Sequence, residues 1–194
     1  MLKDLVLKNR SYRKFHADKK VSENTLKELI NLARLTPSSK NRQPLKYLLL
    51  TESEDTDFLF QQLKWAWYLK EWNGPTVDER PAAYIVMLLD SKLNEHAEID
   101  AGIAAQTILL GAVEKEMGGC IIRTVNHFEV RRNFNLEEEM KIILVIALGF
   151  PNQKVQLTSL QENQNVAYYE REGTHFVPKR DLEEIIIKRK SVTE

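Results

Sequence analysis

The sequence has 194 residues, with 28 lysine plus arginine and 28 aspartate plus glutamate, so its formal net charge is zero. This length predicts one domain, and the balanced charge gives no reason to expect a nucleic acid or a membrane surface as a partner. A single cysteine, no secretory leader at the start and no apolar run near the ~20 residues of a membrane span predict a reduced, cytoplasmic protein.

The N-terminal part of the chain predicts two helices and a strand, with loops between them. Apolar residues at helical spacing predict a short first helix that ends near Asn9, and a basic stretch follows. Ser22 is a candidate N-cap for a second helix, which must stop before Pro37. Residues 45–51 are apolar and lie between a proline and an acidic cluster, so they predict a strand.

The middle of the chain contains its most apolar segments. A helix is predicted around residues 55–63, and the tryptophan-rich segment at 65–72 predicts either a hydrophobic plug or a lid. The continuous apolar run at 82–89 is typical of a buried central strand. Helical spacing predicts a long helix over about residues 95–117, which a glycine pair ends. Its many small residues predict close packing all round, as at a subunit interface or the centre of a fold.

The C-terminal part predicts two more strands and then an arm. Residues 120–125 and 141–149 predict strands, with a short helix at 127–133 between them. After these the composition turns polar, and residues 151–194 predict an arm laid across a partner subunit, or a mobile tail. Helices and strands do not alternate strictly, so the sequence predicts an α+β fold with a mixed, largely antiparallel central sheet flanked by helices.

Residues 10–15 read R-S-Y-R-K-F and are the first candidate for a binding site. Arginine presents fixed, forked donors to phosphate or carbonyl oxygens, so these neighbouring cations and the serine hydroxyl form a compact anion-binding surface. The same residues also suit a solvated helix end, where cations complement the last carbonyl groups. The choice between these interpretations depends on the other motifs of the chain.

Three further motifs follow in order along the chain. They are P-S-S-K-N-R-Q-P at 37–44, A-L-G-F-P at 147–151 and V-P-K-R at 177–180. Together with residues 10–15, and over nearly the whole chain, they resemble the nitroreductase family of FMN-dependent oxidoreductases. The resemblance implies a nitroreductase-like fold and an intertwined homodimer, with two FMN sites at the subunit interface.

In that family an arginine-serine-x-arginine signature holds the FMN phosphate and ribityl chain and places a positive charge near the flavin pyrimidine. A cation fixed there favours the negatively charged reduced flavin and so raises its reduction potential. The resemblance assigns Arg10 to the phosphate, Ser11 to the ribityl chain or pyrimidine edge and Arg13 to the pyrimidine side, with Tyr12 between them and Lys14 in reserve.

The loop at 37–44 is similar to a family element that the neighbouring subunit contributes to the same flavin. Without the resemblance it reads as an ordinary turn, because proline, serine and asparagine are common turn residues. If the loop serves the partner's cofactor, the protein must be a homodimer. The matching residues are Pro37, Ser38, Ser39, Asn41 and Gln43.

Two further pairs of residues are candidates for FMN contacts. Gly118 and Gly119 stand where relatives have a glycine-leucine-glycine turn, and they predict either a helix cap or a close backbone contact to flavin N5 or O4. Lys179 and Arg180 resemble the C-terminal basic pair that closes over the phosphate, with Arg180 the first choice. The alternative for this pair is a solvated position before a short helix.

The remaining candidates concern the substrate, metals and the thiol. Trp65, Trp67 and Trp72 lie where relatives carry a variable, substrate-facing insertion, so they predict either a substrate pocket or core packing. The four histidines are scattered, and no metal site is predicted. Cys120 falls in a predicted buried strand, where a thiol usually behaves as a small hydrophobe.

The resemblance implies an oxidoreductase that moves hydride from NAD(P)H through flavin N5 to an electron-poor acceptor, such as a nitroaromatic or a quinone, in a ping-pong cycle. No side chain is required as an acid or base, because the flavin carries the chemistry. The alternatives are another FMN enzyme of the same fold, acting in reductive dehalogenation, azoline oxidation or flavin breakdown, or a non-enzymatic FMN-binding module.

Overall fold

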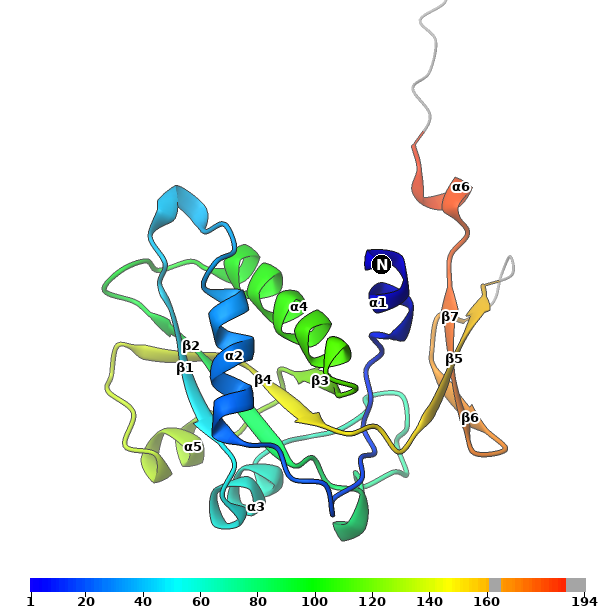
Figure 1. Ribbon diagram of the computed structural model, residues 1–194, viewed down its shortest axis with the longest axis horizontal. Coiled ribbons are helices and arrows are strands. Elements are labelled where there is room, and N and C mark those ends of the chain that lie inside the picture. The colour runs from blue at the N-terminus through cyan, green and yellow to red at the C-terminus, as the bar shows by residue number, and fades with distance from the viewer. Residues whose placement is uncertain (161–164, 188–194) are drawn as a thin grey trace, which may run out of the picture.

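A computed structural model describes residues 1–160 and 165–187 of the protein (Figure 1). A four-stranded sheet packed with helices forms the body of the molecule, and a second, three-stranded sheet lies beside it. The elements in chain order are α1 (Leu2–Lys8), α2 (Glu23–Ala33), η1 (Ser39–Asn41), β1 (Leu45–Leu50), α3 (Ser53–Gln61), η2 (Val77–Glu79), β2 (Ala83–Asp90), α4 (Glu98–Glu114), β3 (Gly118–Ile122), α5 (His127–Asn133), β4 (Met140–Gly149), β5 (Lys154–Ser159), β6 (Tyr169–Arg171), β7 (Thr174–Lys179) and α6 (Leu182–Ile185).

The central sheet has the strand order β1-β2-β4-β3, and each neighbouring pair is antiparallel. The predicted α+β class and antiparallel pairing are confirmed, but the parallel pair that a mixed sheet requires is not found among the described strands of this sheet. The connectivity gives the reason. β2 and β3 run in the same direction and are joined by α4, yet β4 inserts between them and pairs antiparallel with both.

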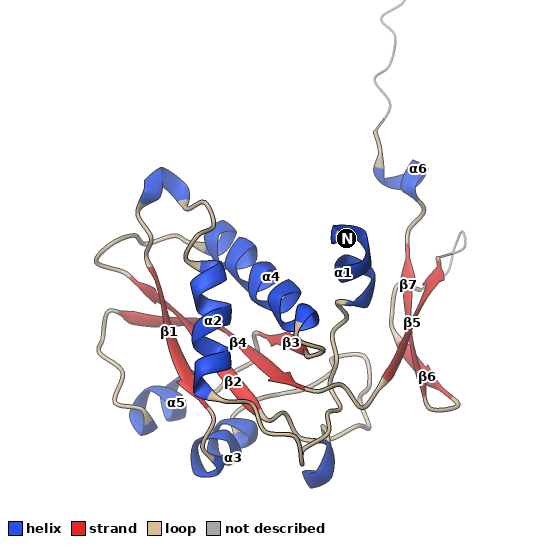
Figure 2. Cartoon of the chain, viewed as in Figure 1, coloured by secondary structure: helices blue, strands red, loops and turns tan. Residues whose placement is uncertain are grey.

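Alternate residues of β2 supply the two halves of the core, because successive side chains of a strand point to opposite faces. Ile85 and Met87 pack in a cluster with α2 and α4, whereas Tyr84 and Val86 pack in a cluster with α3 and α5. Figure 2 shows these two pairs of helices beside the central sheet. The predicted buried strand at 82–89 is therefore confirmed as the centre of the sheet. No helix in the described part of the chain is both long and apolar enough to cross a membrane.

Within one chain the long helix α4 packs closely along one side, whereas its small residues predicted close packing all round. A Cβ on Gly111 would come 2.6 Å from a leucine Cδ1 of α2. The other side is open, with Ile99 78% and Ile103 37% exposed. The helix ends at Glu114, earlier than predicted, and the residue with left-handed backbone after it is Glu116, with φ 58°. The glycine pair is therefore not the helix cap but the start of β3.

The polar C-terminal segment forms three strands that no sequence pattern indicated. β5 pairs parallel with β7, and β6 pairs antiparallel with β7. Most of their side chains are exposed or half-buried, so backbone hydrogen bonds hold this sheet without a clear apolar pattern. α6 lies beyond its end, away from the central sheet (Figure 1). Residues 161–164 and 188–194 of the predicted arm lie outside the described residues, and its contact with a partner stays a prediction.

Candidate functional site

The basic stretch at 10–15 is positioned by its last residue and by its backbone. The ring of Phe15 is fully buried and lies on Gly149, where an added Cβ would come 2.9 Å from the ring. The Tyr12 amide donates to the Gly119 carbonyl oxygen at 3.0 Å. The stretch therefore runs along the start of β3 and the end of β4, so strands distant in sequence determine where its cations lie.

A cavity of about 300 Å³, here called the basic cavity, opens beside this stretch. Arg10, Arg13 and Lys179 line it, and no carboxylate is among the lining residues that the structure describes. Arg10 Nη2 donates to the Val6 carbonyl oxygen at 2.6 Å, but its buried Nε has no hydrogen-bond partner in the described part of the chain. This charge suits a phosphate ester. The other lining residues are Asn9, Ser11, Gln106, Leu109, Ile121, Tyr168, His175 and Val177.

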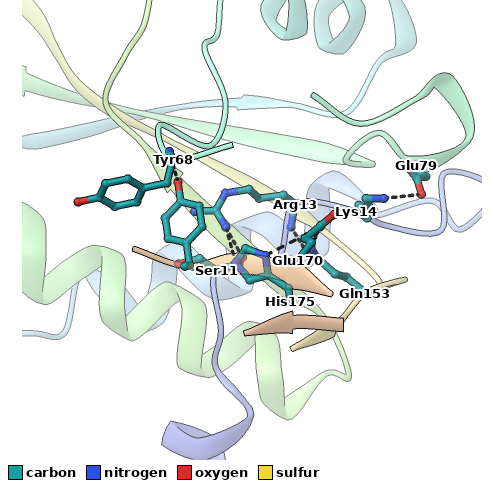
Figure 3. Close-up of polar contacts among 9 residues, drawn as sticks. Ser11, Arg13, Lys14, Tyr68, Glu79, Gln153, Glu170 and His175 are labelled. Atoms are coloured by element: carbon teal, nitrogen blue, oxygen red, sulfur yellow. Dashed lines mark hydrogen bonds and ion pairs between the residues drawn. The ribbon is translucent and has the colours of Figure 1, made fainter. Parts of the chain in front are cut away.

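Arg13, Tyr168 and His175 form a cluster at the wall of the basic cavity. The Arg13 guanidinium lies 4.7 Å from the centre of the Tyr168 ring, and its Nη1 lies 3.4 Å from His175 Nε2 (Figure 3). Arginine can only donate, so His175 Nε2 must accept and the ring must be neutral, with its proton on Nδ1. The sequence did not indicate that Tyr168 and His175 contact Arg13. Tyr168 stands just before β6 and His175 lies in β7, and the pairing of these two strands brings them together.

His175 is 2% exposed, and the nearest carboxylate oxygen to its buried Nδ1 is that of Glu170, at 3.9 Å. Burial and the Arg13 charge lower the pKa of His175, and the charge of Glu170 opposes them only in part.

We expect this histidine to make stability depend on pH. In the unfolded chain His175 takes up a proton near pH 6.5, whereas in the folded chain it does so only at lower pH. The free energy of unfolding should therefore fall as the pH drops below about 6.5. Urea unfolding at several pH values measures this slope, and the His175→Gln variant should lose part of it. The same change at the exposed His127 is the control. Equal slopes in all three proteins would contradict the assignment.

The loop at 37–43 lies apart from the basic cavity. Ser38 Oγ donates to Asp100 Oδ2 at 2.6 Å, and the Ser39 amide donates to Asp100 Oδ1 at 3.1 Å, which fixes the loop to the start of α4. Pro37, Ser38 and Gln43 line a separate cavity of about 70 Å³ together with Asp100. Within one chain, therefore, the structure does not bring this loop to the predicted residues of the basic stretch.

We expect Asp100→Ala to lower the free energy of unfolding by about 1–3 kcal/mol, because two donors of the loop lose their buried acceptor. Asp100 is 4% exposed, so water does not readily replace it. Urea denaturation measures the change, and Glu98→Ala, in the same helical turn but exposed, is the matched control. A stability equal to that of the control would show that the loop is held in another way.

The other predicted FMN contacts divide between those that face the basic cavity and those that do not. Lys179 lines it, whereas Arg180, the first choice from sequence, pairs with Glu184 on α6 and does not. Lys14 Nζ forms an ion pair with Glu79 Oε1 of η2, at 3.5 Å. The backbone of Gly118 is packed against Tyr12, where a Cβ would come 2.5 Å from the ring, so this glycine serves close packing.

Gly119 is packed in the same way. A Cβ there would come 2.5 Å from the Ala147 carbonyl oxygen of β4, and neither glycine is among the residues that line the basic cavity. A backbone contact from Gly119 to a flavin stays a prediction.

The three tryptophans do not share one pocket. Trp65 and Trp67 line a cavity of about 150 Å³, and Trp72 lines a more open one with Glu170. Cys120 lies in β3 and lines the first of these cavities. Burial raises the pKa of its thiol, which favours the neutral form. No group of three or more histidine, cysteine, aspartate or glutamate side chains converges as metal ligands would, within residues 1–160 and 165–187.

The sequence profile of the Nitroreductase family matches residues 6–150. No curated protein matches the sequence. The fold is similar to that of a nitroreductase family protein from Streptococcus pneumoniae TIGR4, with a TM-score of 0.69 and 18% identity over 97% of this chain and 100% of that one.

Two further similar structures are those of an FMN-dependent protein and of a protein in complex with FMN. An FMN-dependent nitroreductase from Clostridium difficile R20291 has a TM-score of 0.64 and 23% identity, over 77% of this chain and 87% of that one. A putative nitroreductase from Exiguobacterium sibiricum 255-15, solved in complex with FMN, has a TM-score of 0.67 and 17% identity, over 79% of this chain and 89% of that one. At these identities the likeness concerns the fold.

Proposed function

The chain belongs to the nitroreductase family of oxidoreductases, and on that premise we propose that it is an FMN-dependent enzyme that uses NAD(P)H to reduce an electron-poor acceptor, such as a nitroaromatic or a quinone. When bound, FMN would accept hydride from the nicotinamide and pass it to the acceptor. The protein's part is to bind the cofactor, to orient it and to set the charge around it.

The observation that carries this proposal is the basic cavity, with three permanent cations and no carboxylate among its described lining residues. Arg10 and Lys179 suit the phosphate, and the unpartnered Arg10 Nε is a buried donor that such a ligand would satisfy. Arg13, held by His175, is the cation for the pyrimidine side of the ring. Apolar contacts for a flat ring come from Leu109, Ile121 and Val177.

We further propose that the functional unit is a homodimer. The open side of α4 exposes Ile99 and Ile103, and α6 exposes Leu182 and Ile185, so both elements offer apolar surface to a second copy. In such a dimer the loop at 37–43, which does not reach the basic cavity of its own chain, is proposed to complete the cavity of its partner. Residues 151–194 are proposed to cross the interface as an arm.

Anaerobic mixing of the FMN-loaded protein with NADH or NADPH, followed by nitrofurazone, tests the reaction. The proposal expects the yellow flavin absorption to bleach with a nicotinamide donor and to return when the nitro compound is added. A protein that holds FMN but is not bleached by either donor would be a binding module. Bleaching without return on nitrofurazone or a quinone would instead indicate another FMN chemistry of the same fold.

A further inference from the structure

The cavity of about 150 Å³ under the tryptophan segment is lined by four parts of the chain, namely Arg13, residues 64–67, residues 120–124 and Tyr168. Its floor is β3, and its roof is the segment 64–67. An antiparallel bridge between Leu63 and Val125 fixes the start of this roof, and the Lys64 amide donates to the Thr124 carbonyl oxygen at 3.1 Å. Both anchors are backbone contacts, and they hold the roof next to the segment that follows β3.

Beyond the cavity, the tryptophan segment is also held from the side of the small sheet. The Tyr68 amide donates to Tyr168 Oη at 3.4 Å, and the two rings meet edge to face with centroids 5.1 Å apart. Tyr168 therefore links the tryptophan segment to the residues before β6. The roof is supported at both ends, so the space below it is a formed cavity.

The lining of this cavity is cationic. Arg13, Lys64 and Arg123 line it, and its lining residues include no carboxylate in the described part of the chain. Within residues 1–160 and 165–187, the side chains of Lys64 and Arg123 have no ion pair or hydrogen bond that would neutralise them. Lys64 and Arg123 are exposed, so their charges are available to a ligand at the cavity mouth. An anionic group is the chemical complement of such a site.

Three aromatic side chains also line the cavity, beside small and aliphatic ones. Trp65, Trp67 and Tyr168 line the cavity, and Trp67 is 83% exposed. A space of this size is about what a single benzene ring occupies in a protein. Aromatic walls favour a flat ring as the occupant, because offset-stacked and edge-to-face contacts stabilise ring pairs.

The cavity adjoins the basic cavity, since both are lined by Arg13, Ile121 and Tyr168. Resting on the function proposed above, we infer that this second cavity selects an acceptor in which an anionic group, such as a carboxylate, is carried on an aromatic ring. The carboxylate lies between Lys64 and Arg123, and the ring lies toward the Arg13 wall and the proposed flavin site. The phosphate groups of the nicotinamide donor are also negatively charged. The donor is much larger than one ring, however, so a cavity of about 150 Å³ does not hold it.

Steady-state kinetics with 4-nitrobenzoate and its neutral methyl ester test the inference, because the two differ only in the charge. Arg123→Gln should raise the KM for the acid about tenfold, the loss expected of one charge-assisted contact, and should leave the KM for the ester and both kcat values unchanged. Lys64→Gln should act in the same direction. Lys70→Gln, in the tryptophan segment but outside this cavity, is the control.

Titration of the FMN-loaded protein with benzoate, which cannot be reduced, gives a readout apart from turnover. Arg123→Gln should weaken benzoate binding about tenfold, measured by the change in flavin absorption or by calorimetry. An equal loss for acid and ester, or a higher KM for NADPH alone, overturns the acceptor assignment. If neither nitro compound is reduced, the proposed function fails, and the benzoate titration then decides the anion site by itself: tenfold weaker binding supports it, and unchanged binding overturns it.

Discussion

Arg10→Met is expected to weaken FMN binding about 10- to 100-fold, the effect of losing one charged hydrogen-bonding partner of a phosphate. Arg10 lines the basic cavity, and its buried Nε has no partner in the described part of the chain. Methionine keeps much of the length and apolar character of the side chain, so the change removes donors and charge more than packing. The measurement is an equilibrium titration that follows the quenching of FMN fluorescence.

The control for this variant is Arg171→Met. Arg171 lies in β6, and within the described part of the chain its ion pair is with the exposed Glu172, so the same charge is removed without touching the basic cavity. The account expects the FMN dissociation constant of this control to match that of the natural sequence. Equal affinities in the two variants would show that Arg10 does not bind the phosphate.

Phe15→Ala is expected to lower the free energy of unfolding by about 3–5 kcal/mol, the range for a fully buried phenylalanine. The ring is 0% exposed and packs on Gly149, and the Phe15 amide also donates to the Glu79 carbonyl oxygen at 2.9 Å. A typical domain has only about 5–15 kcal/mol of stability in total, so this one change should remove much of it. Urea or thermal unfolding, followed by circular dichroism, measures the loss.

Phe128→Ala is the matched control, since Phe128 lies on α5 and is 69% exposed. It is expected to change stability by less than about 0.5 kcal/mol, as surface substitutions usually do. If Phe15→Ala were as mild as its control, the basic stretch would not be anchored by this ring. Its cations would then need another explanation for their position.

The central sheet could be predicted from the sequence because its strands are long and apolar. β2 is buried along nearly its whole length and reads as a continuous apolar run of 8 residues, too short for a typical buried helix, so its length favours a strand. The insertion of β4 between β2 and β3 could not be predicted, since the order of strands depends on contacts distant in sequence. The small sheet was missed for a different reason: strands of mostly exposed, polar residues leave no periodic signal.

The candidate site could be predicted from the sequence where its residues fall in short motifs, in the basic stretch and in V-P-K-R, whose Lys179 also lines the basic cavity. Arg10 and Arg13 stand close together in the sequence, and the structure places both on the basic cavity. His175 and Tyr168 come to Arg13 through the pairing of the small sheet, and nothing in the sequence around them indicates it. Which of Lys179 and Arg180 faces the basic cavity could not be predicted from the sequence, because successive residues at the end of a strand point to opposite sides.

Sedimentation velocity of the FMN-loaded protein, detected at the visible absorption of the flavin, tests the central claim most directly, because it reports both the cofactor and the assembly. The account predicts that the yellow colour moves with a species of twice the 22.6 kDa chain. Flavin that stays at the meniscus as free FMN, while the protein sediments as a single chain, would contradict it.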